Sequence, residues 1–187
     1  MSCRASVRAA RGDVAGAVED AILGLERARE SKDPQSLYPA LARGAQALAA
    51  AGRDAEANAL ADELLALLTS GATGMLSIPE LAFVLVEYGR GAELLAVLDR
   101  RSDRPGPWLE AARAVAAGEF AVAADVFARI GARPHEALAR LRAARELTEA
   151  GRAKEAEAQL GGALAFYRSV GATRSVREAE ALLPASA

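Results

Sequence analysis

Glycines interrupt this otherwise helix-rich sequence at similar intervals, and this pattern restricts the fold more than any other feature. Five breaks between helical stretches carry a glycine, each 29 to 40 residues from the next: Gly12, Gly52, Gly89, Gly118 and Gly151. A glycine at the end of a helix can adopt a left-handed conformation without a Cβ clash, so the chain can reverse there. The intervals match the length of a two-helix repeat. The sequence therefore predicts a series of helical hairpins.

Alanines occupy fixed places around these glycines. The positions seven residues before the five glycines all hold alanine: Ala5, Ala45, Ala82, Ala111 and Ala144. The positions five residues after them hold a small residue in four of five cases, the exception being the third: Ala17, Ala57, Leu94, Ala123 and Ala156. In an antiparallel helix pair these two positions face each other near the turn, where only a small side chain fits. We expect all of them in the interface between paired helices.

Helical periodicity covers nearly the whole chain, and the alternation typical of strands is nearly absent. Apolar residues make up 52% of the sequence but aromatic residues only 4%, so alanine and leucine supply most of the apolar surface. This composition favours closely packed helices. The predicted helices span residues 4–10, 13–31, 35–51, 54–69, 78–88, 92–101, 108–117, 120–130, 134–150, 153–170 and 173–183. The expected fold class is all-α.

The arrangement resembles the tetratricopeptide repeat family. That motif combines a small residue in the first helix, a glycine at the turn, an alanine early in the second helix and a large apolar residue four positions later. The last position holds, from the first repeat to the fifth, Ala21, Ala61, Leu98, Phe127 and Leu160. The aromatic residue usual in the first helix is replaced by Leu41, Ile78, Pro107 and Arg140. The resemblance implies one domain over residues 1–187, a right-handed superhelix of about five antiparallel helix pairs with a C-terminal capping helix.

A second resemblance concerns the final stretch, "ALAFYRSVGATRSVREAEALL", at residues 163–183. It is similar to the C-terminal end of the helical-repeat region of large multidomain bacterial signalling proteins. In those proteins a nucleotidyl cyclase or another output module precedes an ATPase module, and the ATPase module precedes the repeats. The sequence has no cyclase or ATPase motif. The resemblance implies a fragment of a larger chain whose catalytic parts lie elsewhere.

The charge and the cysteine content restrict which classes of partner and which cellular location are expected. The chain has 23 Lys and Arg against 25 Asp and Glu, a formal charge of −2, which matches a nucleic-acid backbone poorly. Cys3 is the only cysteine, so no internal disulfide can form, and a cytoplasmic location is expected. The longest uncharged run, "LLALLTSGATGMLSIP", is broken by Ser, Thr, Gly and Pro, and cannot span a membrane. We expect no nucleic-acid and no membrane partner.

Motifs for catalysis or cofactor binding are missing from the sequence. It has no phosphate-binding loop ending in Gly-Lys-Ser/Thr, no Gly-x-Gly-x-x-Gly after a strand and no Gly-x-Ser-x-Gly. His135 is the only histidine, and Ala139 stands where a helical zinc motif needs a second one. We interpret His135 as a first-turn helix residue, Arg-Gly-Asp at 11–13 as a repeat turn and Gly-Ala-Thr-Gly at 71–74 as a loop. No enzyme activity, cofactor or metal is expected.

The expected binding surface is a concave groove lined by the first helix of each pair. Alignment of the repeats on their glycines predicts these groove residues: Gln46, Ala49, Phe83, Val86, Trp108, Ala112, Val115, Arg145 and Thr148. This set is largely apolar, so it suits a partner helix or hydrophobic segment better than a carboxylate-terminated peptide. The alternative is that these residues fill a tightly wound interior.

Two functions remain open at this point. The first is a protein-interaction or regulatory scaffold domain, which binds a protein or peptide partner or the neighbouring domains of a parent chain. The second is a small-molecule-sensing regulatory domain that controls an attached cyclase or ATPase. The N-terminal end begins with a short helix and no evident cap, so we expect a missing upstream repeat or a homodimer contact there. The apolar stripe expected on the C-terminal cap is Val176, Ala179, Leu182 and Leu183.

Overall fold

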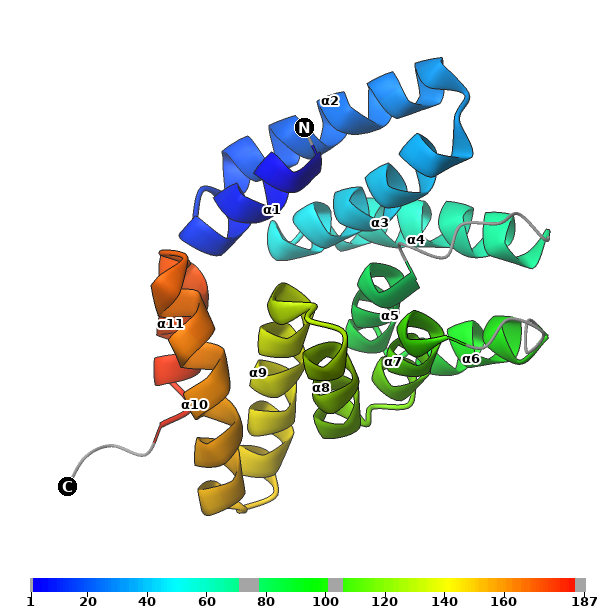
Figure 1. The fold of residues 1–187 in the computed structure, drawn as a ribbon. Coiled ribbons are helices and arrows are strands. Elements are labelled where there is room, and N and C mark those ends of the chain that lie inside the picture. Colours follow the sequence, from blue (N-terminus) through cyan, green and yellow to red (C-terminus); the bar gives the residue numbers. More distant parts are fainter. Residues whose placement is uncertain (1, 71–77, 101–105, 184–187) are drawn as a thin grey trace.

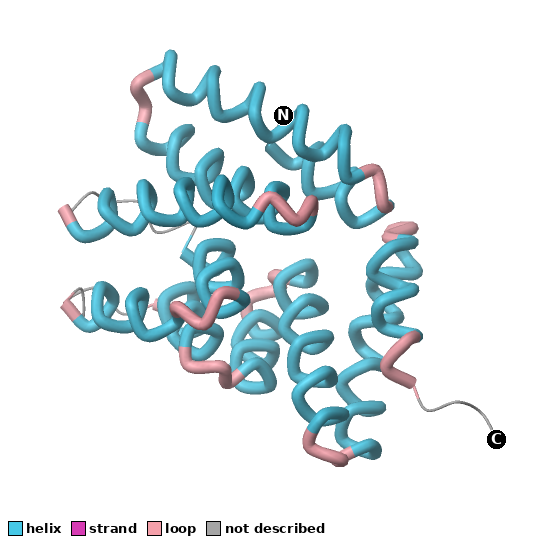
Figure 2. Tube along the Cα trace, turned by 180° about the vertical axis from the view of Figure 1, so that it is seen from behind, coloured by secondary structure: helices cyan, strands magenta, loops and turns pink. Residues whose placement is uncertain are grey.

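The computed structural model describes residues 2–70, 78–100 and 106–183, and all regular secondary structure in them is α-helix (Figure 2). The helices are α1 (Ser2–Arg11), α2 (Val14–Ser31), α3 (Pro34–Ala50), α4 (Asp54–Thr69), α5 (Ile78–Glu87), α6 (Gly91–Asp99), α7 (Pro107–Ala116), α8 (Phe120–Arg129), α9 (Arg133–Glu149), α10 (Ala153–Ser169) and α11 (Thr173–Glu180). The all-α prediction is confirmed, and every predicted helix has its counterpart. The largest difference is at the C-terminus, where α11 ends at Glu180 instead of residue 183.

The glycines at the helix breaks adopt the left-handed conformation that the sequence predicts. Their φ angles lie between 70° and 94° at Gly12, Gly52, Gly89, Gly118 and Gly151. The amide after each glycine donates to the carbonyl five residues earlier, as from Arg152 to Leu147 over 2.8 Å, which satisfies a carbonyl left open by the helix end. The turns at Gly131 and Gly171 have the same geometry, although the sequence alignment did not include them. One glycine turn therefore recurs seven times.

Gly151→Ala should destabilise the protein, because Gly151 has a φ of 73° and a Cβ is strained there. The cost of placing an L-residue in this region is roughly 1–2 kcal/mol. Gly161→Ala is the matched control, since Gly161 lies inside α10 and no atom is within 4 Å of a Cβ placed on it. This second change should stabilise the helix by roughly 0.5–1 kcal/mol. Urea denaturation of both variants measures the difference, and a stabilising Gly151→Ala would contradict the turn geometry.

The ten positions predicted to lie between paired helices are all buried. None of them is more than 2% exposed: Ala5, Ala17, Ala45, Ala57, Ala82, Leu94, Ala111, Ala123, Ala144 and Ala156. The two helices of each hairpin are in contact, namely α1 with α2, α3 with α4, α5 with α6, α7 with α8, and α9 with α10. Alanine at nine of these ten places allows the helices to approach closely, and Leu94 is the exception.

Contacts between hairpins define how they stack. Helices α1, α3, α5 and α7 each contact the next in this series, and α4 contacts α6 (Figure 1). The main hydrophobic core contains residues of α2 to α9, and a second cluster lies between α9, α10 and α11. We call α1, α3, α5, α7, α9 and α11 the odd-numbered helices.

The last helix meets the first, as the orange α11 below the blue α1 in Figure 1 shows. The Thr173 hydroxyl donates to the Arg11 carbonyl over 2.9 Å, and Arg174 Nη1 donates to the Ala50 carbonyl over 3.4 Å. Ala10 packs against the apolar cluster that contains Ala179. One side of α1, for which the sequence shows no cap, is therefore covered by α11.

An ion pair between a buried carboxylate and an exposed arginine joins the first two helices. Asp20 on α2 is only 4% exposed, and Arg4 on α1 donates to it from Nε over 2.7 Å and from Nη2. Arg8 Nε lies 3.4 Å from the same carboxylate. The hydrogen bond from Arg4 lowers the pKa of Asp20 below its ordinary value. Paired in this way, the carboxylate can remain charged although it is buried.

Asp20→Asn should make stability less dependent on pH in acid. Because the pKa of Asp20 is lowered in the folded protein, its stabilising contribution is complete above the unfolded pKa of about 3.9 and is lost as the pH falls through the folded pKa. The variant should therefore be less stable than the wild type at neutral pH, with a difference that shrinks in acid. Glu19→Gln on the exposed side of α2 controls for the lost charge. Thermal melts across the pH range test this, and a constant difference would contradict it.

Candidate binding site on the inner helices

The predicted groove residues divide into two groups. Phe83, Ala112 and Val115 are buried, with 4%, 0% and 0% of their surfaces exposed, so a partner at the surface does not reach them. Residues that remain half-buried are Gln46, Ala49, Val86, Trp108 and Arg145, and Thr148 is exposed. For the first group the structure agrees with the alternative that these side chains fill the interior. The reason is the position of α7, which is in contact with α5, α6 and α8.

A polar cluster that sequence reasoning missed joins three odd-numbered helices. Its centre is Glu80 in the first turn of α5, which is 7% exposed. Its Oε1 atom lies 3.4 Å from His135 Nε2 on α9 and 3.9 Å from Arg43 Nη2 on α3. Gln46 Nε2 on α3 donates to the Glu80 carbonyl over 3.4 Å. We call Arg43, Gln46, Glu80 and His135 the Glu80 cluster.

One oxygen of the Glu80 cluster is unsatisfied. Glu80 Oε2 is buried and has no hydrogen-bond partner among the described residues. Such a group costs about 1–3 kcal/mol, because it has lost water without gaining a donor. A buried carboxylate of this kind is retained here beside a histidine and an arginine, and it ties α3 and α9 to α5.

An ion pair also joins α5 to α9, farther along the two helices. Arg142 Nη2 lies 2.9 Å from Glu87 Oε2. Glu87 follows Glu80 by seven residues and Arg142 follows His135 by seven, so the two bridges lie about two helical turns apart. The helices therefore run in the same direction and are connected by charged side chains. The contacts between these two odd-numbered helices are polar here, whereas the sequence predicted a largely apolar groove.

Two aromatic side chains pack against the His135 ring of the Glu80 cluster. The His135 ring lies 5.1 Å from Phe127 and 5.6 Å from Trp108, measured between ring centroids. Trp108 also makes an edge contact with Phe127 at 6.2 Å. His135 is in the first turn of α9, as predicted, and Trp108 keeps part of its surface exposed. Trp108 is thus a half-exposed aromatic side chain that packs against Phe127 and His135 next to polar groups.

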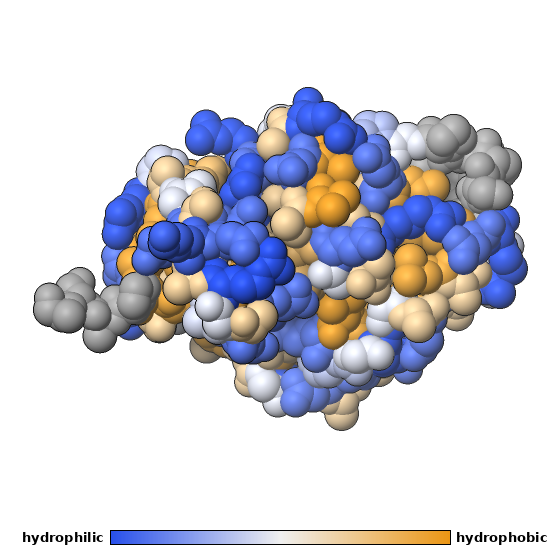
Figure 3. All heavy atoms as spheres, turned by 90° about the horizontal axis from the view of Figure 1, so that it is seen from below, coloured by the Kyte–Doolittle hydropathy of each residue, from blue (hydrophilic) through white to orange (hydrophobic). Residues whose placement is uncertain are grey.

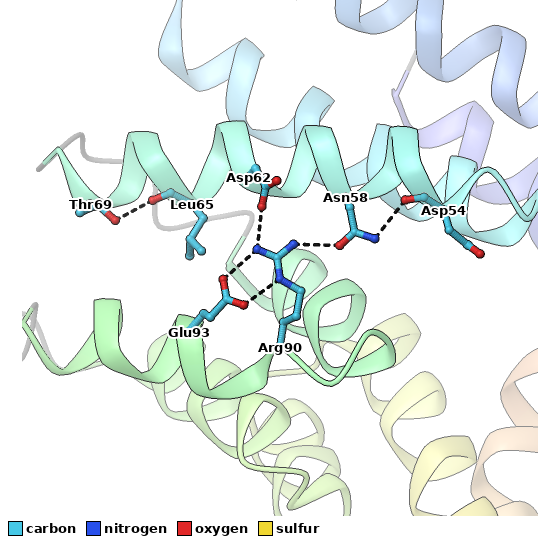
Figure 4. A network of polar contacts seen from close by, with 7 residues as sticks. All are labelled: Asp54, Asn58, Asp62, Leu65, Thr69, Arg90 and Glu93. Carbon is cyan, nitrogen blue, oxygen red and sulfur yellow. Dashed lines mark hydrogen bonds and ion pairs between the residues drawn. The ribbon is translucent and has the colours of Figure 1, made fainter.

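Arg90 forms a separate network on the outer side, between α4 and α6 (Figure 4). Its guanidinium donates to Glu93 over 2.8 and 2.7 Å, to Asp62 over 2.6 Å and to Asn58 over 2.8 Å. The hydrogen bonds to Glu93 and Asp62 raise the pKa of Arg90. The same Gly-Arg-x-x-Glu pattern recurs at 52–56 and 151–155, where Arg53 pairs with Glu56 and Arg152 with Glu155. This pattern has a structural role, because it fixes the beginnings of α4, α6 and α10.

A shallow hollow of about 380 Å³ lies at the turn between α10 and α11. Its lining residues are Arg168, Gly171, Thr173, Val176 and Arg177. It lies next to the contact between α11 and α1, because the Thr173 hydroxyl also donates to the Arg11 carbonyl. This hollow is within the lower part of the size range of small-molecule sites.

Exposed apolar side chains do not form one large patch on the face seen in Figure 3, where apolar areas alternate with hydrophilic ones. The exposed large apolar residues of the described chain are Val7, Ile22, Leu23, Val122, Val170 and Leu183. Leu183 was expected in the apolar stripe of the C-terminal cap, but it is 39% exposed. Ala179, from the same stripe, is fully buried.

The remaining sequence motifs have structural positions. Asp13 of the Arg-Gly-Asp tripeptide caps α2 by accepting from the Gly16 amide over 3.0 Å, so the tripeptide forms the turn between α1 and α2. Residues 71–74 and the side chain of Cys3 lie outside the described part. Within that part, no three His, Cys, Asp or Glu side chains are grouped to hold a metal ion. No described helix is both long and apolar enough to cross a membrane.

Comparisons with family models, with curated proteins and with solved structures find no match to this chain.

Proposed function

We propose that this chain is a tetratricopeptide-like repeat domain that binds a protein or peptide partner and has no catalytic activity, as part of a cytoplasmic bacterial signalling protein. The observation that carries the proposal is the sevenfold glycine turn, together with the ten buried positions that flank five of these turns. The successive contacts of α1 with α3, of α3 with α5 and of α5 with α7 are consistent with a right-handed superhelix of about five helix pairs. Proteins of this architecture use the surface of their first helices for binding.

The binding surface in this proposal follows the odd-numbered helices where their side chains remain accessible. Trp108 is half-exposed beside the Glu80 cluster, and Arg145 on α9 has no carboxylate within ion-pair distance among the described residues. Tryptophan and arginine are the side chains that most often dominate binding energies. An amphipathic partner helix with acidic residues suits this combination better than a purely apolar one. The neighbouring domains of a parent chain are partners of the same kind.

Arg145→Glu and Trp108→Ala should both weaken binding of a helical peptide selected against the purified chain from a displayed library. Each change removes a side chain of the type that contributes about 2 kcal/mol or more, so the dissociation constant should rise at least roughly thirtyfold. Lys154→Glu, an exposed charge reversal on α10, is the control and should leave binding unchanged. Calorimetric titration measures the constants, and circular dichroism verifies the fold. Unchanged binding by both variants removes the assigned surface.

The second candidate function is a small-molecule-sensing domain that controls an attached cyclase or ATPase. The hollow between α10 and α11 favours it, because it has the size of a ligand site and is lined by two arginines. The predicted homodimer contact at the N-terminal end stays a prediction, and Val7 on α1 and Ile22 and Leu23 on α2 are exposed there.

A further inference from the structure

The hollow at the α10–α11 turn lies where the first and the last helix meet. Arg177 Nη2 is 3.6 Å from the position that a Cβ would take on Gly12, in the turn between α1 and α2. Arg174 Cβ lies 3.9 Å from the same position. Three of the five lining residues belong to α11, and Arg177 adjoins the turn between α1 and α2.

Positive charge is in excess around this hollow. Arg168 is paired with Glu180 over 2.8 Å, and Arg174 with Glu178 over 2.9 Å. Arg11 and Arg177, by contrast, have no carboxylate within ion-pair distance among the described residues. The Arg177 side chain donates a hydrogen bond from Nε to the Thr173 carbonyl over 3.4 Å. Arg11 is the last residue of α1 and Arg177 lies on α11, so both belong to the two helices that meet here. Arg177 lines the hollow, so its positive charge is available to an anion there.

The ligand class follows from these groups. A guanidinium binds phosphate and carboxylate oxygens through paired N–H donors. The Thr173 hydroxyl is already used by the Arg11 carbonyl, so the arginines remain as the donors for a ligand. Val176 offers an apolar contact beside them, and a volume of about 380 Å³ accommodates a small metabolite.

We propose that this hollow binds a small metabolite with several phosphate or carboxylate oxygens, and that the bound anion strengthens the contact of α11 with α1. The proposal rests on the second candidate function and gives it a site and a ligand class. A ligand that binds only when α11 contacts α1 increases the population of that arrangement. Ligand binding and the contact between the two helices are therefore linked.

The test is titration of the purified chain with pyrophosphate and, separately, with citrate, with sodium chloride added to keep ionic strength constant. We expect saturable binding with a dissociation constant below about 1 mM, a higher melting temperature and slower amide hydrogen exchange in α11. Arg177→Gln should weaken binding at least about tenfold, since it removes a charged donor pair. Arg152→Gln is the control, because Arg152 lies at the start of α10 and pairs with Glu155.

Each outcome has a defined meaning. Binding of pyrophosphate alone identifies a phosphate ligand, binding of citrate alone identifies a carboxylate ligand, and binding of both supports the shared oxyanion chemistry. The absence of saturable binding by either probe overturns the proposal, and so does equal binding by Arg177→Gln and the wild type. Peptide binding that depends on Arg145 is measured separately, so this result does not affect the protein-binding function.

Discussion

Phe127→Ala is expected to lower the free energy of unfolding by about 3–5 kcal/mol, the range for removing a large aromatic side chain from a core. Phe127 is 0% exposed. Its ring lies 6.3 Å from Phe83, 6.2 Å from Trp108 and 5.1 Å from His135. These neighbours belong to α5, α7 and α9, so one side chain of α8 joins three other helices. The truncation leaves a cavity that no single helix can fill by a small shift.

Val122→Ala provides the control for Phe127→Ala on the same helix. Val122 is 50% exposed, so its truncation should change stability by less than about 0.5 kcal/mol. Phe127→Leu keeps an apolar group in place, so its free energy of unfolding should fall less than that of the alanine variant. This leucine variant preserves the test if Phe127→Ala does not fold. Urea denaturation gives all three values. If Phe127→Ala costs no more than Val122→Ala, the described core is wrong.

Gly91→Ala should destabilise the protein by about 1–3 kcal/mol or more, because the added methyl group meets main-chain atoms. A Cβ on Gly91 would lie 2.1 Å from the Ala116 carbonyl oxygen and 3.1 Å from Val86 Cγ2. A side chain can rotate away, but the Ala116 carbonyl belongs to the last turn of α7. The substitution therefore forces α6 and α7 apart.

Gly24→Ala is the matched control for Gly91→Ala. Gly24 lies inside α2, and no atom is within 4 Å of a Cβ placed on it. Alanine has a higher helix propensity than glycine, so this change should stabilise the protein by about 0.5–1 kcal/mol. Thermal and urea denaturation should give opposite signs for the two variants. The same sign for both would show that α6 and α7 are not in close contact at Gly91.

The helices and turns were predictable because local interactions determine them. A glycine ends a helix through its own backbone freedom, and alanines next to it show where the paired helix approaches. Gly131 and Gly171 were missed because the alignment assumed one glycine for every two helices, whereas α8–α9 and α10–α11 are joined by the same turn. Gly91 takes the place held by Asp54 and Ala153 in other repeats, and only the approach of α7 explains it.

The candidate site was less predictable because it depends on how closely successive hairpins pack. The alignment identifies the helix face on which Ala112 and Val115 lie, but their burial depends on the neighbours of α7. The Glu80 cluster joins residues up to 92 positions apart, from Arg43 to His135, and no local pattern predicts such a contact. Its only signal is the shared seven-residue spacing of Glu80 with Glu87 and of His135 with Arg142, which is too common to identify a pair.

The contact between α11 and α1 changes how this chain should lose its structure. In a linear array each unit is stabilised only by its neighbours, and the two ends fray independently. Here the Thr173–Arg11 bond joins residues 162 positions apart, so fraying at one end removes protection from the other. Such a contact closes a long loop and has a high entropic cost, which places its formation late in folding. Unfolding should therefore begin with the separation of α11 from α1.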